Sequence, residues 1–318
     1  MNAALVRGAI TVLCGIAGLM AVRQLTRRGS VATLDAIDRL LSWGDGAIRQ
    51  VHSGCYGADP AQALEIFLPR SRALDPAVTG RALPVILFIH GGGWVSGCPQ
   101  DYRFIARRLA PHGYAVALAG YRLHPDARYP DMLHDAAAAF GWITDHGAQW
   151  GLDADRIVLM GHSAGAYNAM MLGLDRRWHQ GLTHHPCAVV GLAGPYDFLP
   201  LDDIATIASF GHVEDLRETQ PLHHAHGTAP PILLIHGAHD RRVKPRHSLA
   251  LARALASAGA RSETHVLDAI GHAGLIMRFA RPFAQDRRPL ARVLDFLQRT
   301  TQLPASPPVQ PQRATRAA

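Results

Sequence analysis

The chain has 318 residues, 48% hydrophobic and 18% charged, and this balance is typical of a globular protein rather than a disordered one. Its formal net charge is +7, yet no helix-turn-helix, zinc-finger or RNA-binding motif accompanies the basic excess, which argues against a nucleic-acid partner. The four cysteines lack CxxC spacing and are too few for a disulfide scaffold, although export of the domain would allow a Cys55–Cys98 bridge. The histidine clusters lie in loop-like stretches without an HExxH pattern, so no metal site is predicted.

The N-terminal segment is apolar. Residues 3–22 are interrupted by a single charge, Arg7. A membrane span needs about 20 largely apolar residues, and the core of a signal peptide needs about 7–15. Because basic residues follow directly and no small-x-small cleavage site is evident, we expect an uncleaved membrane anchor within residues 1–30. The basic cluster favours a cytoplasmic side for the domain that follows. The alternatives are a helix packed on the domain, or a soluble protein that is cytoplasmic or exported.

The rest of the chain alternates between helical patterns and short apolar runs. Helical spacing of apolar residues predicts a helix over 31–50, and loose alternation predicts an edge strand over 61–69. Continuous apolar runs predict buried strands at 84–90, 114–119, 156–160, 187–192, 231–236 and 263–267. Helices are predicted at 101–111, 131–147, 164–178, 245–258 and 286–299. This alternation predicts an α/β domain over 31–300, with a mostly parallel central sheet covered by helices on both faces. Residues 301–318, rich in Pro, Gln, Ala and Arg, are expected to be a disordered tail.

The motif Gly161-His-Ser-Ala-Gly165 stands between a predicted strand and a predicted helix. Small residues at both ends permit the tight turn that lifts a serine hydroxyl clear of the sheet. The N–H groups at the start of the helix are free to stabilise negative charge. We therefore expect Ser163 to be a nucleophile, rather than a helix cap that happens to have glycine neighbours.

The run His90-Gly-Gly-Gly-Trp94 follows the strand predicted at 84–90. Three adjacent glycines leave backbone N–H groups unshielded, which suits an oxyanion hole. We predict Gly92 and Gly93 as donors, with the N–H of Ala164 as a third. His90 is expected to be a structural hydrogen-bonding residue.

Two further strand ends carry an acid and a base. Asp240 follows the strand predicted at 231–236, and His272 follows the last strand. The order Ser163, Asp240, His272 along the chain is that of α/β-hydrolase triads. Asp197 and Asp268 are rival acids, whereas His236 and His239 are too near Asp240 in sequence to face it.

At these residues the sequence resembles the α/β-hydrolase superfamily, specifically its HGGGW-bearing esterases. Tyr121-Arg-Leu-His-Pro125, Asp135, Trp142 and Gly151-Leu-Asp-Ala-Asp-Arg-Ile157 agree with that group. Hormone-sensitive-lipase-like esterases usually have Asp before the serine, where this chain has His162. The resemblance therefore favours the relatives of feruloyl esterases and kynurenine formamidases.

This resemblance implies a serine carboxylesterase that acts on a small-molecule ester through an acyl-enzyme and needs no cofactor. The short stretch between Asp197 and Pro230 implies a small cap and an open site. Trp94, Tyr167, Tyr196 and Phe198 are candidates for the pocket wall, with core packing as the alternative for each. An arylformamidase or amidase would use the same triad, and a non-catalytic, membrane-anchored binding module is a further alternative.

Overall fold

The computed structural model describes residues 30–42 and 46–301. The strands are β1 (Ile48–Cys55), β2 (Ala63–Pro69), β3 (Leu83–Ile89), β4 (Ala115–Ala119), β5 (Leu152–His162), β6 (Ala188–Leu192), β7 (Ile232–Gly237) and β8 (Ser262–Leu267). The α-helices are α2 (Ser30–Leu41), α3 (Pro76–Thr79), α4 (Arg103–Leu109), α5 (Asp131–His146), α6 (Ala164–Leu174), α7 (Ile204–Phe210), α8 (Arg246–Ser257), α9 (His272–Met277) and α10 (Arg288–Thr301). The 3-10 helices are η1 (Pro99–Tyr102), η2 (Ala110–His112), η3 (Gly147–Trp150), η4 (Arg176–His179), η5 (Leu216–Thr219), η6 (Pro221–His224) and η7 (Arg281–Phe283).

The strands form one sheet in the order β1-β2-β4-β3-β5-β6-β7-β8. β2 pairs antiparallel with both β1 and β4, and the pairs from β4 through to β8 are parallel. The prediction of a mostly parallel sheet is confirmed. Parallel strands place their carboxyl ends at one edge, and ligands in such sheets bind beyond that edge.

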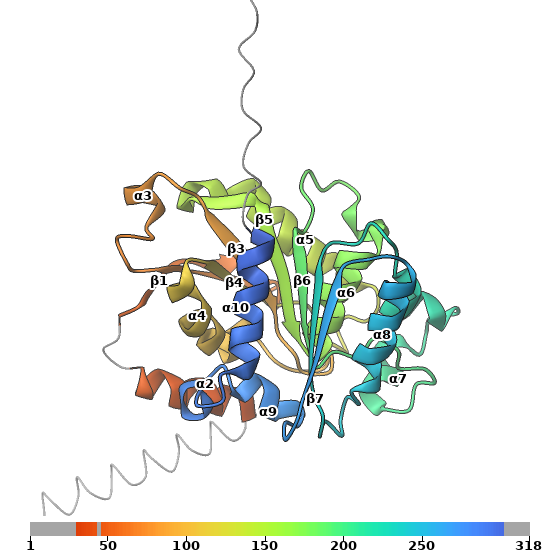
Figure 1. The fold of residues 1–318 in the computed structure, drawn as a ribbon. Helices are drawn as coiled ribbons and strands as arrows, with labels where there is room; N and C mark the ends of the chain where they lie inside the picture. The colour runs from red at the N-terminus through yellow and green to blue at the C-terminus, as the bar shows by residue number, and fades with distance from the viewer. Residues whose placement is uncertain (1–29, 43–45, 302–318) are drawn as a thin grey trace, which may run out of the picture.

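Both faces of the sheet are covered by helices, and each face has its own apolar core. One core joins the sheet to α5, α6 and α8. The other joins it to α2, α4, α9 and α10, and Figure 1 shows α4 and α10 lying over this face. The strands between these layers are buried on both sides, which explains why they read as continuous apolar runs in the sequence.

The helix predicted over 31–50 is wrong in its second half. α2 ends at Leu41, and Ile48 already begins β1, which pairs with β2 at the edge of the sheet. Gly44-Asp-Gly46 is a turn signal that could have ended the helix. The pairing of β1 with β2 is a tertiary contact, which local periodicity does not reveal.

No helix in the described ranges is both long enough and apolar enough to cross a membrane. The expected anchor at residues 3–22 lies outside the described residues, as does nearly all of the tail expected at 301–318. The bridge considered between Cys55 and Cys98 is not formed, because both cysteines are free.

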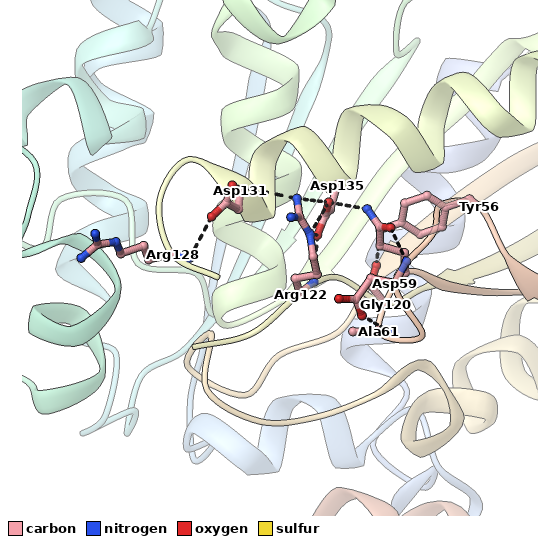
Figure 2. A network of polar contacts seen from close by, with 9 residues as sticks. Tyr56, Asp59, Ala61, Gly120, Arg122, Arg128, Asp131 and Asp135 are labelled. Carbon is pink, nitrogen blue, oxygen red and sulfur yellow. Dashed lines mark hydrogen bonds and ion pairs between the residues drawn. The ribbon is translucent and has the colours of Figure 1, made fainter. Parts of the chain in front are cut away.

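A buried carboxylate fixes the loop that follows β4. Asp135 on α5 is almost fully buried and accepts hydrogen bonds from the backbone N–H of Arg122 at 2.8 Å and from its guanidinium at 2.8–3.1 Å. Gln62 Nε2 donates to the same carboxylate at 2.7 Å. Figure 2 shows this network, in which the Tyr56 hydroxyl also donates to Gly120 O at 2.7 Å. Asp135 therefore joins α5 to the loop after β4 and to the residue that precedes β2.

Replacement of Asp135 by Ala is expected to lower the free energy of unfolding by about 1–3 kcal/mol, because a backbone N–H and the Gln62 amide lose a buried acceptor. The part-exposed Arg122 keeps Asp131, at 3.9 Å, as a counter-charge. Urea unfolding followed by circular dichroism measures the change. Asp145→Ala removes an exposed aspartate from the same helix and is expected to cost less than about 0.5 kcal/mol. Equal losses in the two variants would show that the buried network contributes nothing.

Candidate active site

The expected site residues meet at the carboxyl edge of the sheet. The glycine loop 91–93 follows β3, Ser163 follows β5, and Asp240 lies in the loop after β7. His272 begins α9, which Figure 1 places near the lower edge of the molecule. Segments far apart in the sequence thus supply one site.

Ser163 occupies a strained turn between β5 and α6. Its backbone has φ 56° and ψ −122°, a left-handed region that non-glycine residues rarely adopt. A Cβ on Gly161 would stand 2.2 Å from Gly165 O, and a Cβ on Gly165 would stand 2.1 Å from Ile89 O. The two glycines are therefore required by the close approach of backbone segments, and the turn presents the serine hydroxyl at the end of the sheet.

Three side chains form a continuous hydrogen-bonded chain. His272 Nε2 lies 3.0 Å from Ser163 Oγ, and His272 Nδ1 lies 2.7 Å from Asp240 Oδ2. The Asp240 side chain is fully buried, and the His272 side chain is 15% exposed. Because a carboxylate accepts, His272 Nδ1 carries the proton and Nε2 is free to accept the serine proton. The arrangement can deprotonate Ser163 as it attacks an electrophile.

The carboxylate of Asp240 is held by backbone N–H groups as well as by histidine side chains. Its Oδ1 accepts from the backbone N–H groups of Arg242 at 3.0 Å and Val243 at 2.9 Å. Burial opposes ionisation of this carboxyl, but hydrogen bonds from His236 and His272 outweigh it and hold the pKa of Asp240 well below its usual range. The carboxylate therefore stays charged at neutral pH.

His236 is a partner that the sequence reasoning set aside. Its Nε2 donates to Val243 O at 2.7 Å and lies 3.3 Å from Asp240 Oδ2, while its Nδ1 accepts from the Ser248 hydroxyl at 2.8 Å. His236 makes its contacts with Val243, Ser248 and the carboxylate of Asp240, and so supports the acid. The signal in the sequence was a histidine that ends a buried strand four residues before the acid.

The rival acids, Asp197 and Asp268, contact other parts of the chain through their backbone atoms. The backbone N–H of Asp197 donates to His247 Nδ1 at 3.3 Å, and the backbone carbonyl of Asp268 accepts from Arg288 at 3.3 Å. Neither carboxylate is hydrogen bonded to His272 within the described residues.

The glycine loop forms a tight turn beside the serine. Gly92 has φ +132°, and a Cβ there would stand 1.8 Å from Ser96 O, so only glycine fits. Gly92 O accepts from the N–H groups of Val95 and Ser96. Within the described residues the N–H groups of Gly92 and Gly93 donate to no backbone carbonyl, and Ala164 is the first residue of α6. All three residues line the space that opens at Ser163.

Two cavities meet at Ser163 and share Gly93, Ser163 and Arg242 as lining residues. The α7-side cavity, of about 130 Å³, extends between the loop after β7 and the start of α7. The α9-side cavity, of about 280 Å³, extends between the glycine loop, η1 and the start of α9. A substrate with its reactive carbon at Ser163 can place one substituent in each cavity.

The aromatic candidates divide into two groups. Trp94 and Phe198 line the α7-side cavity, whereas Tyr167 and Tyr196 are fully buried and line neither cavity at Ser163. The Tyr167 hydroxyl donates to Thr219 O at 2.8 Å, and its ring packs edge-on against Trp94. Tyr167 and Tyr196 are therefore core residues behind the cavity wall.

His90 supports the glycine loop from within the core. Its ring stacks on Tyr121 with centroids 4.4 Å apart, and its Nδ1–H donates to Gly91 O at 2.8 Å. Burial lowers the pKa of His90 to about 4. The folded protein thus holds this histidine neutral.

Acidification from pH 7 to pH 5 is expected to remove about 2 kcal/mol of stability through His90 alone. In the unfolded chain the pKa is near 6.5, so between that value and about 4 the unfolded state binds a proton that the folded state does not. This contribution is fully present above pH 6.5 and is lost as the pH falls towards 4. Urea unfolding at both pH values, on wild type and His90→Gln, measures it.

The exposed histidine His223 provides the control, because His223→Gln is expected to retain the full acid sensitivity. A His90→Gln variant whose stability falls as much as that of wild type would contradict the assignment to His90.

A mostly parallel sheet between two helical layers, with a serine at the turn after β5 and a histidine and an acid after later strands, defines an α/β-hydrolase. The model of the BD-FAE family matches residues 73–255, more than half of the chain. The chain belongs to the BD-FAE family, and the resemblance to α/β-hydrolase esterases is confirmed.

Similar proteins carry esterase names. "Esterase LipC" of Mycobacterium tuberculosis (strain ATCC 25618 / H37Rv) is 30% identical over 207 residues, which cover 58% of this chain and 50% of that protein. The "Probable isoprenylcysteine alpha-carbonyl methylesterase ICMEL1" of Arabidopsis thaliana is 27% identical over 251 residues, 70% of this chain and 51% of that protein. The chain spans about half the length of the curated relatives it matches.

The fold agrees with a solved structure, the "ESTERASE B from Lactobacillus Rhamnosis (HN001)". Its TM-score is 0.70 at 24% identity, covering 89% of this chain and 95% of that one.

Proposed function

We propose that the protein is a serine carboxylic ester hydrolase whose catalytic domain is residues 31–300. The observation that carries this proposal is the hydrogen-bonded chain from Ser163 Oγ through His272 to Asp240, at 3.0 Å and 2.7 Å, on a strained turn. The esterase names of its relatives support the same conclusion.

In the proposed reaction Ser163 Oγ attacks the ester carbonyl carbon while His272 Nε2 takes the hydroxyl proton. Asp240 stabilises the imidazolium that forms, and the N–H groups of Gly92, Gly93 and Ala164 hydrogen bond to the developing oxyanion. Collapse of the tetrahedral intermediate breaks the carbon–oxygen bond to the alcohol, which leaves with the proton from His272. Water, deprotonated by His272, then attacks the acyl-enzyme and releases the carboxylic acid, and the proton returns to Ser163.

The cavities support esters of small to medium size. The two spaces that meet at Ser163 have volumes of about 130 and 280 Å³, which suit short acyl and alcohol groups rather than long chains. Trp94 and Phe198 supply apolar surface in one of them.

The test is hydrolysis of p-nitrophenyl acetate, butyrate and octanoate, followed by labelling with a fluorophosphonate and mapping of the modified peptide. We expect hydrolysis, with octanoate the poorest substrate, and a label on Ser163. N-formylkynurenine in a parallel assay tests the amide alternative, since the same triad could expel a nitrogen leaving group. Folded protein that hydrolyses no ester and takes no label would overturn the proposal in favour of a binding module.

A further inference from the structure

The loop after β7 places unpaired cations around the α7-side cavity. Arg242, Lys244 and Arg246 all line it, and within the described residues none of the three forms an ion pair. His247, which also lines the cavity, stays neutral, because burial and the charge of Arg246 lower the pKa of this histidine to about 4.

The opposite wall carries two carboxylates, Asp202 and Asp203. The Asp203 carboxylate accepts from the N–H of Ala205 at 2.7 Å and so caps α7. Three cations against two carboxylates leave an excess of positive charge in this cavity. A cavity wall on which cations outnumber carboxylates favours an anionic ligand group.

Arg242 is the one of these three cations that lines both cavities at Ser163. Its Nη2 lies 3.9 Å from the point where a Cβ on Gly93 would stand. Its backbone N–H donates to Asp240 Oδ1, so the triad acid itself fixes the position from which this side chain extends. The guanidinium therefore reaches beside the glycine loop and Ser163, where it can pair with a carboxylate in a two-pronged hydrogen bond.

We propose that the preferred substrates are esters whose acyl or alcohol part carries a carboxylate, and that Arg242 is the residue that selects them. This inference rests on the proposed ester hydrolysis and names its substrate class. The carboxylate lies in the α7-side cavity against Arg242, with Lys244 and Arg246 contributing charge, while the ester carbonyl lies at Ser163.

The experiment compares charged and uncharged esters by pH-stat at low ionic strength. Monomethyl adipate against methyl heptanoate places the charge on the acyl side, and 4-carboxyphenyl acetate against phenyl acetate places it on the alcohol side. In at least one pair wild type is expected to favour the charged ester in kcat/KM by about tenfold, as a charge-assisted hydrogen bond allows. The pair that shows the preference identifies which part of the substrate enters the α7-side cavity.

The readout for Arg242 is the ratio of kcat/KM values, charged over uncharged. Arg242→Gln is expected to lower this ratio about tenfold, Arg242→Lys less, and 0.5 M NaCl is expected to weaken the wild-type preference. Arg241→Gln is the matched control, because Arg241 precedes Arg242 in the same loop and lines neither cavity. It is expected to leave the ratio unchanged.

The outcomes separate this inference from the proposed function. Hydrolysis of the uncharged esters with no preference in either pair, or a preference that survives Arg242→Gln, would overturn the inference and leave the esterase proposal intact. Folded wild type that hydrolyses neither kind of ester would overturn both.

Discussion

Ser163→Ala is expected to reduce kcat for p-nitrophenyl butyrate hydrolysis by about 10⁴- to 10⁶-fold, the range seen when a triad nucleophile is removed. The methyl group cannot form the acyl-enzyme, and residual turnover depends on the oxyanion donors alone. The same variant should lose all labelling by a fluorophosphonate. Steady-state kinetics and intact-protein mass spectrometry measure the two effects.

Ser53→Ala is the matched control, since Ser53 is an exposed serine on β1 away from the site. Both variants should unfold at the temperature of wild type. Substantial turnover by folded Ser163→Ala would point to another nucleophile and remove the basis of the mechanism.

Asp240→Asn is expected to lower kcat by about 10⁴-fold near neutral pH while leaving the fold intact. The carboxamide can turn an N–H towards His272 Nδ1, which then accepts it, so that the proton moves to Nε2 and the ring can no longer accept from Ser163. It also offers no negative charge to the imidazolium. The Michaelis constant should change little, because Asp240 is buried behind His272 and does not line either cavity at Ser163.

The rival acids provide the comparison. Asp197→Asn and Asp268→Asn should each retain turnover within a few-fold of wild type, because the carboxylate hydrogen bonded to His272 Nδ1 is that of Asp240. A loss of turnover of 10³-fold or more in either variant is the size expected when a triad acid is removed. Such a loss would show that Asp197 or Asp268, rather than Asp240, is the acid of the triad.

Most of the sheet could be predicted because its strands are buried on both faces. A strand in that environment must be apolar throughout, so β3 to β7 are visible as short apolar runs without any knowledge of their neighbours. The same reasoning located the site, since residues at the carboxyl ends of parallel strands converge whatever their separation along the chain. Ser163, Asp240 and His272 are 109 residues apart at most, and His272 lies within hydrogen-bonding distance of both of the others.

Edge and surface features were not predictable in this way. β1 is half-exposed, so its composition does not distinguish it from the end of a helix, and only its pairing with β2 makes it a strand. Tyr167 and Tyr196 are aromatic residues of the kind that line pockets, but the packing around them places both in the core.

The sequence by itself determined the class of fold, the strained serine turn, the glycine loop and the order of acid and base. These depend on local properties: apolar runs, glycines that allow close backbone approach, and positions counted from strand ends. The tertiary structure decided which aspartate faces His272, that His236 supports it, and that Arg242 extends beside Gly93 at the junction of two cavities. The first and the third depend on contacts between segments distant in sequence, and the second depends on how the loop after β7 folds back towards its own strand.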